Sequence, residues 1–310
     1  MTAGSLMYRA LDRMSEKVTA ASGGRLVMRC NPADAIVPAT KEFDGVDGGA
    51  LDYSMTAYGY WTDKFPAAQL FTYQVGGLSP MEAAAWQLIG GGNELAMEMI
   101  TGYNVKLLTG VILTPEIFLW SHKELKSPAD MKGLKYRSGG GDEPTIFGEY
   151  LGTAGVFMPT GEIYESMQRN VIDGFQCSSP GTDYSMGFQE VAEYCWLSPV
   201  RQPSEFHSYL FNTKSWAALP DDLKVLVEEM CLATGLENYT YMMIEDVKAI
   251  AKIKEYGTNV LPVPKSIEDA ILAATADYYA EKRATDPFMA KVLDSLDAFM
   301  KTYREAFQRL

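Results

Sequence analysis

Histidine and cysteine are scarce in this chain, which limits the chemistry it can perform. It has two histidines, His122 and His207, among 310 residues. Histidine is the usual general base near neutral pH, so acid–base catalysis here would depend on Asp, Glu, Lys or Tyr. None of the four cysteines stands in a CxxC pair or at zinc spacing from a histidine. We expect free thiols, with Cys177 and Cys195 as the pair most worth testing for a disulfide.

Positive charge is also in short supply. The chain has 27 Lys and Arg against 40 Asp and Glu, a formal net charge of -13. This balance argues against nucleic acids and anionic membrane surfaces as partners, because like charges repel. It leaves room for a small anionic ligand, since screening lets one local arginine outweigh distant charges.

Long apolar runs and targeting patterns are missing as well. No window is apolar over the roughly 18 residues that a membrane span requires. The first residues read as an amphipathic helix instead of a signal peptide. The sequence therefore indicates either a cytoplasmic protein or a processed or truncated form of an exported one.

What the sequence does contain is an alternation of helical and strand patterns. Helices are expected at residues 5–20, 40–48, 80–102, 143–151, 160–170, 220–256, 266–284 (with Ser266 and Asp269 at capping-box spacing) and 287–310. Strands are expected at residues 25–29, 53–57, 71–75, 105–109, 135–137, 155–158, 172–177 and 209–212. This alternation predicts an α/β fold, in which ligands bind at the carboxyl ends of strands.

The length favours about two domains. We expect lobe one at residues 1–123 plus 210–250, lobe two at 124–209, and a C-terminal helical section at 251–310. A long helix would run between the lobes. Two lobes with a polar and aromatic crevice predict hinge closure around a small ligand.

Arg137 is the most informative residue. It ends a short strand in the stretch 134–141, LKYRSGGG, and a helical turn closed by Gly133 precedes it. A guanidinium at a strand end, beside flexible backbone, can bind a carboxylate through two parallel hydrogen bonds. The alternative is a surface arginine that pairs with a nearby acid.

Several stretches in order carry a family resemblance: SGGRL at 22–26, KGLKYR at 132–137, GEIY to IDG over 161–174, GFQEV at 187–191, and Asn212 to Pro220. The chain resembles the solute-binding subunits of TRAP (tripartite ATP-independent periplasmic) transporters. The resemblance implies a type II periplasmic binding-protein fold, a periplasmic location, and capture of an organic acid for a membrane permease. It also implies that Arg137 binds the ligand carboxylate, and it allows a homodimer.

The chain departs from this family at two places. Keto-acid and lactate binders often use a metal cation held by acidic side chains where this chain has Gln176 and Gln202. A neutral amide is a poor replacement for a carboxylate at a cation site. We therefore expect no metal and no cofactor, with the amides bonding the ligand directly. The family also opens with a strand before its first helix, and we expect that strand and the leader peptide to be absent from this sequence.

The other candidate ligand contacts are aromatic or follow strands. Aromatic residues could form a wall for the apolar part of a bulky acid, or simply pack in the core. The candidates are Tyr58, Tyr60, Trp61, Phe118, Trp120 and Phe206, together with the polar Ser138, Cys177, Ser179 and His207.

Two other functions compete with a binding protein for a 2-oxo acid or a bulkier aromatic acid. One is a cysteine-dependent hydrolase that uses Cys177 and His207, although neither stands in a nucleophile motif. The other is a ligand-sensing domain of a signalling system, which would have the same fold. We expect a binding protein and no enzyme.

Overall fold

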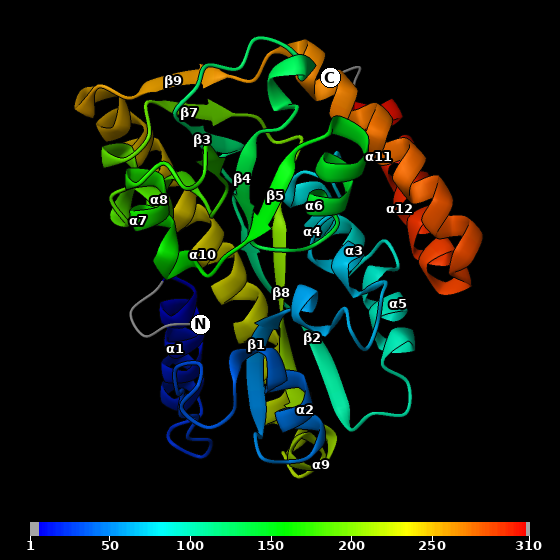
Figure 1. The fold of residues 1–310 in the computed structure, drawn as a ribbon. Helices are drawn as coiled ribbons and strands as arrows, with labels where there is room; N and C mark the ends of the chain where they lie inside the picture. The colour runs from blue at the N-terminus through cyan, green and yellow to red at the C-terminus, as the bar shows by residue number, and fades with distance from the viewer. Residues whose placement is uncertain (1–5, 308–310) are drawn as a thin grey trace. The chain divides into compact units, whose positions relative to one another are not determined.

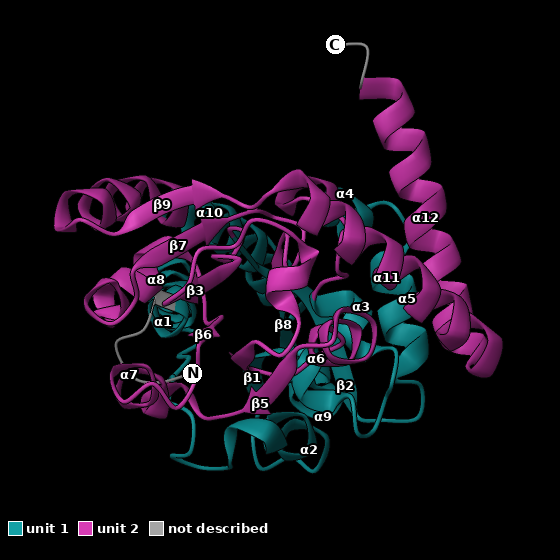
Figure 2. Ribbon diagram, turned by 45° about the horizontal axis from the view of Figure 1, so that its top comes forward, with its two compact units in different colours: residues 1–72, 83–113, 206–241 teal, residues 73–82, 114–205, 242–310 magenta. Residues whose placement is uncertain are grey.

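The computed structural model describes residues 6–307, which form two compact units (Figure 2). Of the described residues, unit 1 comprises 6–72, 83–113 and 206–241, and unit 2 comprises 73–82, 114–205 and 242–307. The sequence predicts crossings between the lobes near residues 123 and 209, and the chain passes between the units at 113/114 and 205/206, as well as at 72/73, 82/83 and 241/242. Residues 242–307 cluster with unit 2.

Unit 1 is built on a sheet of three strands in the order β1 (Tyr53–Ala57), β8 (Glu205–Asn212), β2 (Val105–Leu113). β1 is antiparallel to β8, with Tyr53 opposite Phe211. Gly110 of β2 has no room for a side chain, because an added Cβ would lie 1.7 Å from the His207 carbonyl oxygen. The α-helices of unit 1 are α1 (Leu6–Ala21), α2 (Glu42–Asp47), α3 (Ala68–Thr72), α5 (Gly92–Met99) and α9 (Thr213–Ala217), and α4 (Pro80–Leu88) begins in unit 2 and ends in unit 1.

Unit 2 is built on a six-stranded mixed sheet, with α7 and α8 on one side and α6 and α11 on the other (Figure 1). Its strand order is β5 (Ala154–Phe157), β4 (Lys135–Ser138), β6 (Gly174–Phe175), β3 (Leu119–Ser121), β7 (Tyr194–Leu197), β9 (Asn259–Pro262). Its helices are α6 (Glu143–Thr145), α7 (Ile163–Gln168), α8 (Pro180–Ser185), α11 (Lys265–Thr285) and α12 (Pro287–Phe307). Helix α10 (Asp221–Tyr256) has residues in both units.

The predicted α/β class is confirmed, and so are several elements. The strand at 53–57 has its predicted bounds, and the long helix begins one residue later than predicted. α1 ends as the glycines indicate, with Gly23 and Gly24 at φ +63° and +79°. The ends of the predicted first and last helices, residue 5 and residues 308–310, lie outside the described residues. No helix among residues 6–307 is long and apolar enough to cross a membrane.

Other predicted elements were wrong. The strand predicted at 71–75 does not form, and its first two residues belong to helix α3 (Ala68–Thr72), because an apolar run that is buried all round has no diagnostic period. The helix predicted over 80–102 is split into α4 and α5 around Gly91, whose φ is +96°. The strand at 172–177 shortens to Gly174–Phe175, and the C-terminal section contains a strand, β9.

Two further local predictions were also wrong. Helix α11 has Pro264 at its N-cap with no side-chain cap, and Lys265 bonds Asp269, so Ser266 does not form the predicted capping box. Residues 25–29 are not paired as a strand. Instead, the backbone N–H of Leu26 donates to Ser22 Oγ, and that of Met28 donates to Thr19 Oγ1.

Candidate functional site

Arg137 lies on β4 in the interior of the unit 2 sheet. Its strand is parallel to both neighbours, with Arg137 opposite Val156 of β5 and Phe175 of β6. The carboxyl ends of these three strands therefore lie at one edge, where the loops after β4, β5 and β6 begin. Arg137 is only 5% exposed, so its charge is largely removed from water.

The guanidinium of Arg137 is held by neutral oxygens. Nε donates to the Met158 carbonyl at 2.8 Å, and Nη1 donates to the Gln176 carbonyl at 2.7 Å. Nη2 donates more weakly to Thr160 Oγ1 at 3.3 Å. Within residues 6–307 no carboxylate lies within 4.0 Å of Arg137. A guanidinium has five N–H groups, so one on Nη1 and one on Nη2 stay available to an anion.

Gln176 and Ser138 complete the polar surroundings of this arginine. Both are buried, and the Gln176 amide Nε2 donates to Ser138 Oγ at 3.4 Å. Gly139 packs against them, since an added Cβ would lie 3.4 Å from Gln176 Nε2 and 3.5 Å from Arg137 Nη1. The structure thus brings together three predicted residues: Arg137, Ser138 and Gln176.

Gln202 belongs to a different cluster, around Arg201. Arg201 is fully buried and donates to Glu116 Oε2 at 2.7 Å and to Glu143 Oε2 at 3.1 Å. Its Nη1 also donates to Gln202 Oε1 at 3.1 Å, while Gln202 Nε2 donates to Glu205 at 3.4 Å. Two carboxylates therefore balance Arg201, whereas Arg137 has none. Of the two buried arginines of the described residues, Arg137 is therefore the one whose charge no carboxylate of the chain offsets.

Sequence reasoning missed Thr160, Arg201 and Glu116. Thr160 could have been found, because it follows the strand at 155–158 as a polar residue at a strand end. The carboxyl of Glu116 has a shifted pKa: burial raises this pKa to about 7, although the charge of Arg201 lowers it. The local sequence does not reveal this ion pair, because Glu116 and Arg201 are 85 positions apart.

Two further acidic groups follow β6: the partly buried thiol of Cys177 and the fully buried carboxyl of Asp183. Burial raises the pKa of the Cys177 thiol and of the Asp183 carboxyl well above their ordinary values. Asp183 Oδ2 accepts a hydrogen bond from the Trp120 indole N–H at 2.8 Å, while Oδ1 has no partner among the described residues. A thiol with a raised pKa is a poor nucleophile, so Cys177 lacks the activation that a hydrolase requires. All four cysteines are free.

We expect the stability of the protein to fall between pH 5 and pH 8 and Asp183→Asn to reduce that fall. A raised folded-state pKa means that folding favours the protonated carboxyl. The stabilisation from the protonated Asp183 carboxyl is fully present below the pKa that this group has in the unfolded chain. It is lost as the pH rises toward the higher pKa of Asp183 in the folded protein. One such group changes the free energy of unfolding by at most about 1.4 kcal/mol per pH unit.

Urea unfolding of both proteins at pH 5 and pH 8 measures this difference. Asp222→Asn is the matched control, because Asp222 is exposed and pairs with Arg25. Equal pH dependence in wild type and Asp183→Asn would show that Asp183 is ionised in the folded state.

The predicted aromatic residues are divided between the units. Trp120 and Phe118 are buried in unit 2, and Trp120 belongs to the core cluster around Phe175 and Phe188. In unit 1, Tyr58 hydrogen-bonds Ser208, and the Trp61 ring packs 4.9 Å from that of Phe43. Phe206 and His207 are buried on β8, and Tyr60 is half exposed. Of the six aromatics, Tyr60 is therefore the most accessible to a ligand.

The predicted contact Ser179 stands at the start of α8, where its Oγ lies 3.4 Å from Thr182 Oγ1.

The donor groups around Gln176 are a poor fit for a metal ion. Gln176 offers a neutral amide, and its own carbonyl oxygen already accepts from Arg137. The Glu116 carboxylate is engaged by Arg201. Residues 6–307 contain no group of three or more His, Cys, Asp or Glu side chains arranged to hold a metal.

Comparison with known proteins gives a family and a fold. A model of the family described as bacterial extracellular solute-binding protein, family 7, matches residues 1–286. A relative from Nostoc, named monocarboxylate 2-oxoacid-binding periplasmic protein, is 24% identical over 293 residues, which cover 94% of this chain and 79% of the relative.

Solved structures show the same fold. A TRAP transporter solute-binding protein from Bordetella bronchiseptica, a dimer described with calcium and picolinate, is 24% identical, with a TM-score of 0.90 over 98% of this chain and 90% of that one. One from Colwellia psychrerythraea, described with calcium and pyruvate, is 26% identical, with a TM-score of 0.89 over 99% of this chain and 95% of that one.

Proposed function

Because the chain belongs to family 7 of the bacterial extracellular solute-binding proteins, we propose that it binds a small monocarboxylate and delivers it to a TRAP permease. It is a solute-binding protein and not an enzyme. The ligand class is supported by the 2-oxoacid-binding relative from Nostoc and by the pyruvate and picolinate of the two similar structures. A 2-oxo acid is the first candidate and an aromatic acid the second.

The observation that carries this proposal is the unbalanced charge of Arg137. A buried cation is costly unless an anion pairs with it, and a carboxylate matches the two N–H groups that remain on Nη1 and Nη2. The three protein acceptors fix the plane of the guanidinium before a ligand arrives. An arginine that is already oriented loses less freedom on binding, which favours affinity.

Gln176 and Ser138 are the proposed neighbours of the bound acid. Their mutual hydrogen bond is long at 3.4 Å, so either group can exchange it for a ligand oxygen at small cost. An amide that donates through Nε2 suits the second oxygen of a 2-oxo acid. Both groups are neutral, so they add orientation and leave the charge of the ligand to Arg137.

We propose further that the acid binds without a metal ion, unlike the relatives described with calcium. The amide of Gln176 and the engaged carboxylate of Glu116 leave a cation with weak ligands. A periplasmic location and a homodimer remain predictions from the family resemblance.

A thermal-shift series with pyruvate and picolinate tests both parts of this proposal. A ligand that binds only the folded protein stabilises it by about 2.7 kcal/mol at one hundred times Kd. We expect at least one acid to raise Tm, with the same shift in EDTA as in added calcium. If no acid raises Tm while sugars or amines do, carboxylate binding is wrong. If EDTA abolishes the shift from an acid, only the metal-free part is wrong.

A further inference from the structure

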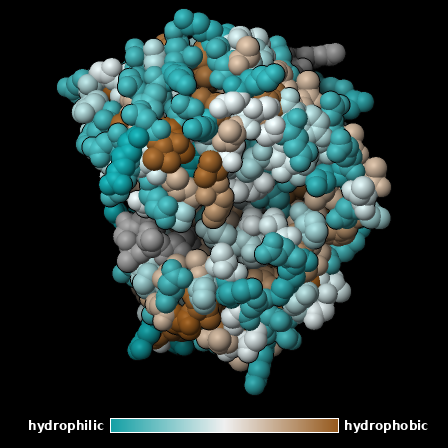
Figure 3. Space-filling view, in the orientation of Figure 1, coloured by the Kyte–Doolittle hydropathy of each residue, from teal (hydrophilic) through white to brown (hydrophobic). Residues whose placement is uncertain are grey.

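Unit 2 contains a cavity of about 510 Å³ that none of the candidate ligand contacts lines. It lies where the end of α7, the segment before β7 and the turn from α10 into β9 meet. Figure 3 shows largely hydrophilic surface at the upper left, where β9 begins. The walls of the cavity come from His122, Gln168, Asn170 and residues 189–193 and 256–259. Its volume is in the range of sites for small molecules.

Two carboxylates line this cavity, and each is held through one oxygen only. Glu193 Oε2 lies 2.7 Å from His122 Nδ1. The other ring nitrogen of His122 lies 3.0 Å from the Met167 carbonyl oxygen, which fixes the imidazole. Glu190 Oε2 accepts a hydrogen bond from the Tyr164 hydroxyl at 2.8 Å. The Oε1 atoms of Glu190 and Glu193 have no hydrogen-bond partner among residues 6–307, so two oriented carboxylates offer free acceptors.

A buried amide without a partner lies next to Glu190 in the sequence. Gln189 is 8% exposed and lines the cavity, yet its Oε1 has no hydrogen-bond partner among the described residues. Its backbone carbonyl, by contrast, accepts from Thr258 Oγ1 at 3.4 Å. A buried amide oxygen is costly to leave unbonded. This atom therefore points to a donor group that comes from outside the chain.

The lining is negatively charged, and its one tyrosine is open to solvent. Among the described residues, those that line the cavity include two carboxylates and no lysine or arginine. Tyr256 is 59% exposed, so its ring is accessible, and the face of an aromatic ring attracts a cation. Residues 6–307 contain no group of three or more His, Cys, Asp or Glu side chains arranged to hold a metal. Because an anion would be repelled, the lining fits an organic cation.

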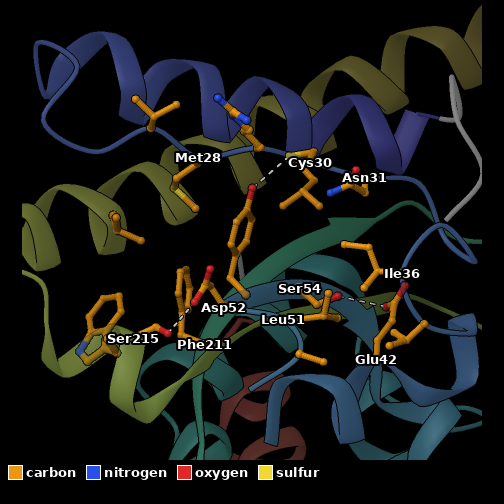
Figure 4. A pocket seen from close by; sticks show the side chains of 18 of the residues that line it. Met28, Cys30, Asn31, Ile36, Glu42, Leu51, Asp52, Ser54, Phe211 and Ser215 are labelled. Carbon is orange, nitrogen blue, oxygen red and sulfur yellow. Dashed lines mark hydrogen bonds between the residues drawn. The ribbon is translucent and has the colours of Figure 1, made fainter. Parts of the chain in front are cut away.

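A cavity of about 630 Å³ in unit 1 does not combine these features (Figure 4). Its Glu42 carboxylate accepts from Ser54 Oγ at 3.2 Å, and its Asp52 carboxylate accepts from a serine hydroxyl as well. A cation, Arg29, lines the same cavity. None of the described side chains that line it has a buried polar atom without a partner. The unbonded amide of Gln189 thus distinguishes the unit 2 cavity.

We propose that the unit 2 cavity is a second binding site, which takes a guanidinium group. The planar cation would donate to the open oxygens of Glu190 and Glu193 and to the amide oxygen of Gln189. Its face would stack on the ring of Tyr256. A guanidinium suits these partners better than an ammonium, because its five N–H groups lie in one plane and its faces stack on aromatic rings. The site shares no residue with the Arg137 site, so it is independent of the proposed function.

An amide NMR titration of the wild-type full chain with L-argininamide tests this proposal. The probe carries a guanidinium and no carboxylate, so the Arg137 site should not bind it. We expect a Kd below about 1 mM, with shifts confined to the amides of residues 189–193 and 256–259. L-Lysinamide has the same charge but an ammonium in place of the guanidinium, and it should bind at least about fivefold more weakly. This comparison is unaffected by any folding defect of a variant.

A free molecule and an arginine side chain of another polypeptide carry the same guanidinium, and a blocked Gly-Arg-Gly tripeptide distinguishes them. A tripeptide that binds within about threefold of argininamide shows that the cavity accepts an arginine side chain of a polypeptide. Much weaker binding of the tripeptide shows that the site takes a free molecule.

Glu193→Gln and Glu255→Gln separate this site from general attraction to a protein with a formal net charge of -13. Glu193→Gln removes a charge of the lining and should weaken argininamide binding about tenfold. Glu255 is exposed and precedes Tyr256 but does not line the cavity, so its variant should change the affinity less than about twofold. The proposal is overturned if neither segment shifts at about 10 mM argininamide, if lysinamide binds as tightly, or if both variants weaken binding equally.

Discussion

Replacing Arg137 with alanine should weaken binding of the cognate monocarboxylate about a hundredfold, or roughly 2.7 kcal/mol. The loss is this large because Arg137 is 5% exposed and is the arginine near Gln176 that no carboxylate of the described chain balances. Without it, the ligand carboxylate would lose its counter-charge in a site that is largely closed to water. Isothermal titration calorimetry measures the change.

Two matched variants show whether this loss is specific. Arg137→Lys keeps the charge but loses the planar fork, so its affinity should fall between those of wild type and alanine. Arg25→Ala removes an exposed arginine that pairs with Asp222, and it should bind the acid like wild type. Unchanged affinity in Arg137→Ala, with a folded protein by circular dichroism, would remove Arg137 from the site.

Replacing Arg201 with methionine should lower the free energy of unfolding by about 3–5 kcal/mol. Its side chain is 1% exposed and bonds two carboxylates, Glu116 and Glu143, which are 8% and 0% exposed. Methionine fills much of the volume but leaves the carboxylates buried without a cation. Urea unfolding at pH 7.5 measures the loss.

The control is Arg283→Met, which breaks ion pairs with the exposed Asp294 and Asp297 and should cost at most about 1 kcal/mol. Adding Glu143→Gln to Arg201→Met should restore part of the lost stability, because it removes one uncompensated charge. A loss for Arg201→Met no larger than that for Arg283→Met would show that the Arg201 cluster is not a structural ion pair.

The sequence singles out Arg137 as a candidate because its signal is local. A strand pattern, an arginine at its end and three glycines stand together in 134–141. The acceptors of its guanidinium were harder to find. Met158 and Thr160 follow the neighbouring strand β5, and only the parallel register of β4 and β5 brings them to Arg137.

The Arg201 cluster could not be predicted, because its members are distant in the chain. Glu143 and Glu116 lie 58 and 85 positions from Arg201. Each reads locally as an ordinary charged residue, and only the fold buries them together. The family resemblance alone predicts that Gln202 acts together with Gln176, whereas in the structure Gln202 bonds Arg201 and Glu205.

The 26–31 segment shows a different limit of sequence patterns. Its alternation predicts a strand, and its backbone does alternate between a bonded and an open side. A strand also needs a partner in register, and none of the described residues supplies one. The prediction of a strand was therefore wrong about pairing, although the local pattern that prompted it is present.

The central claim is that Arg137 recognises the carboxylate of the ligand, and a thermodynamic cycle tests it most directly. Calorimetry would compare an acid that raises Tm, such as pyruvate, with its neutral methyl ester, in wild type and in Arg137→Ala. We predict that wild type prefers the acid by about a hundredfold and that the variant loses this preference. An equal preference for the acid in both proteins would contradict the account.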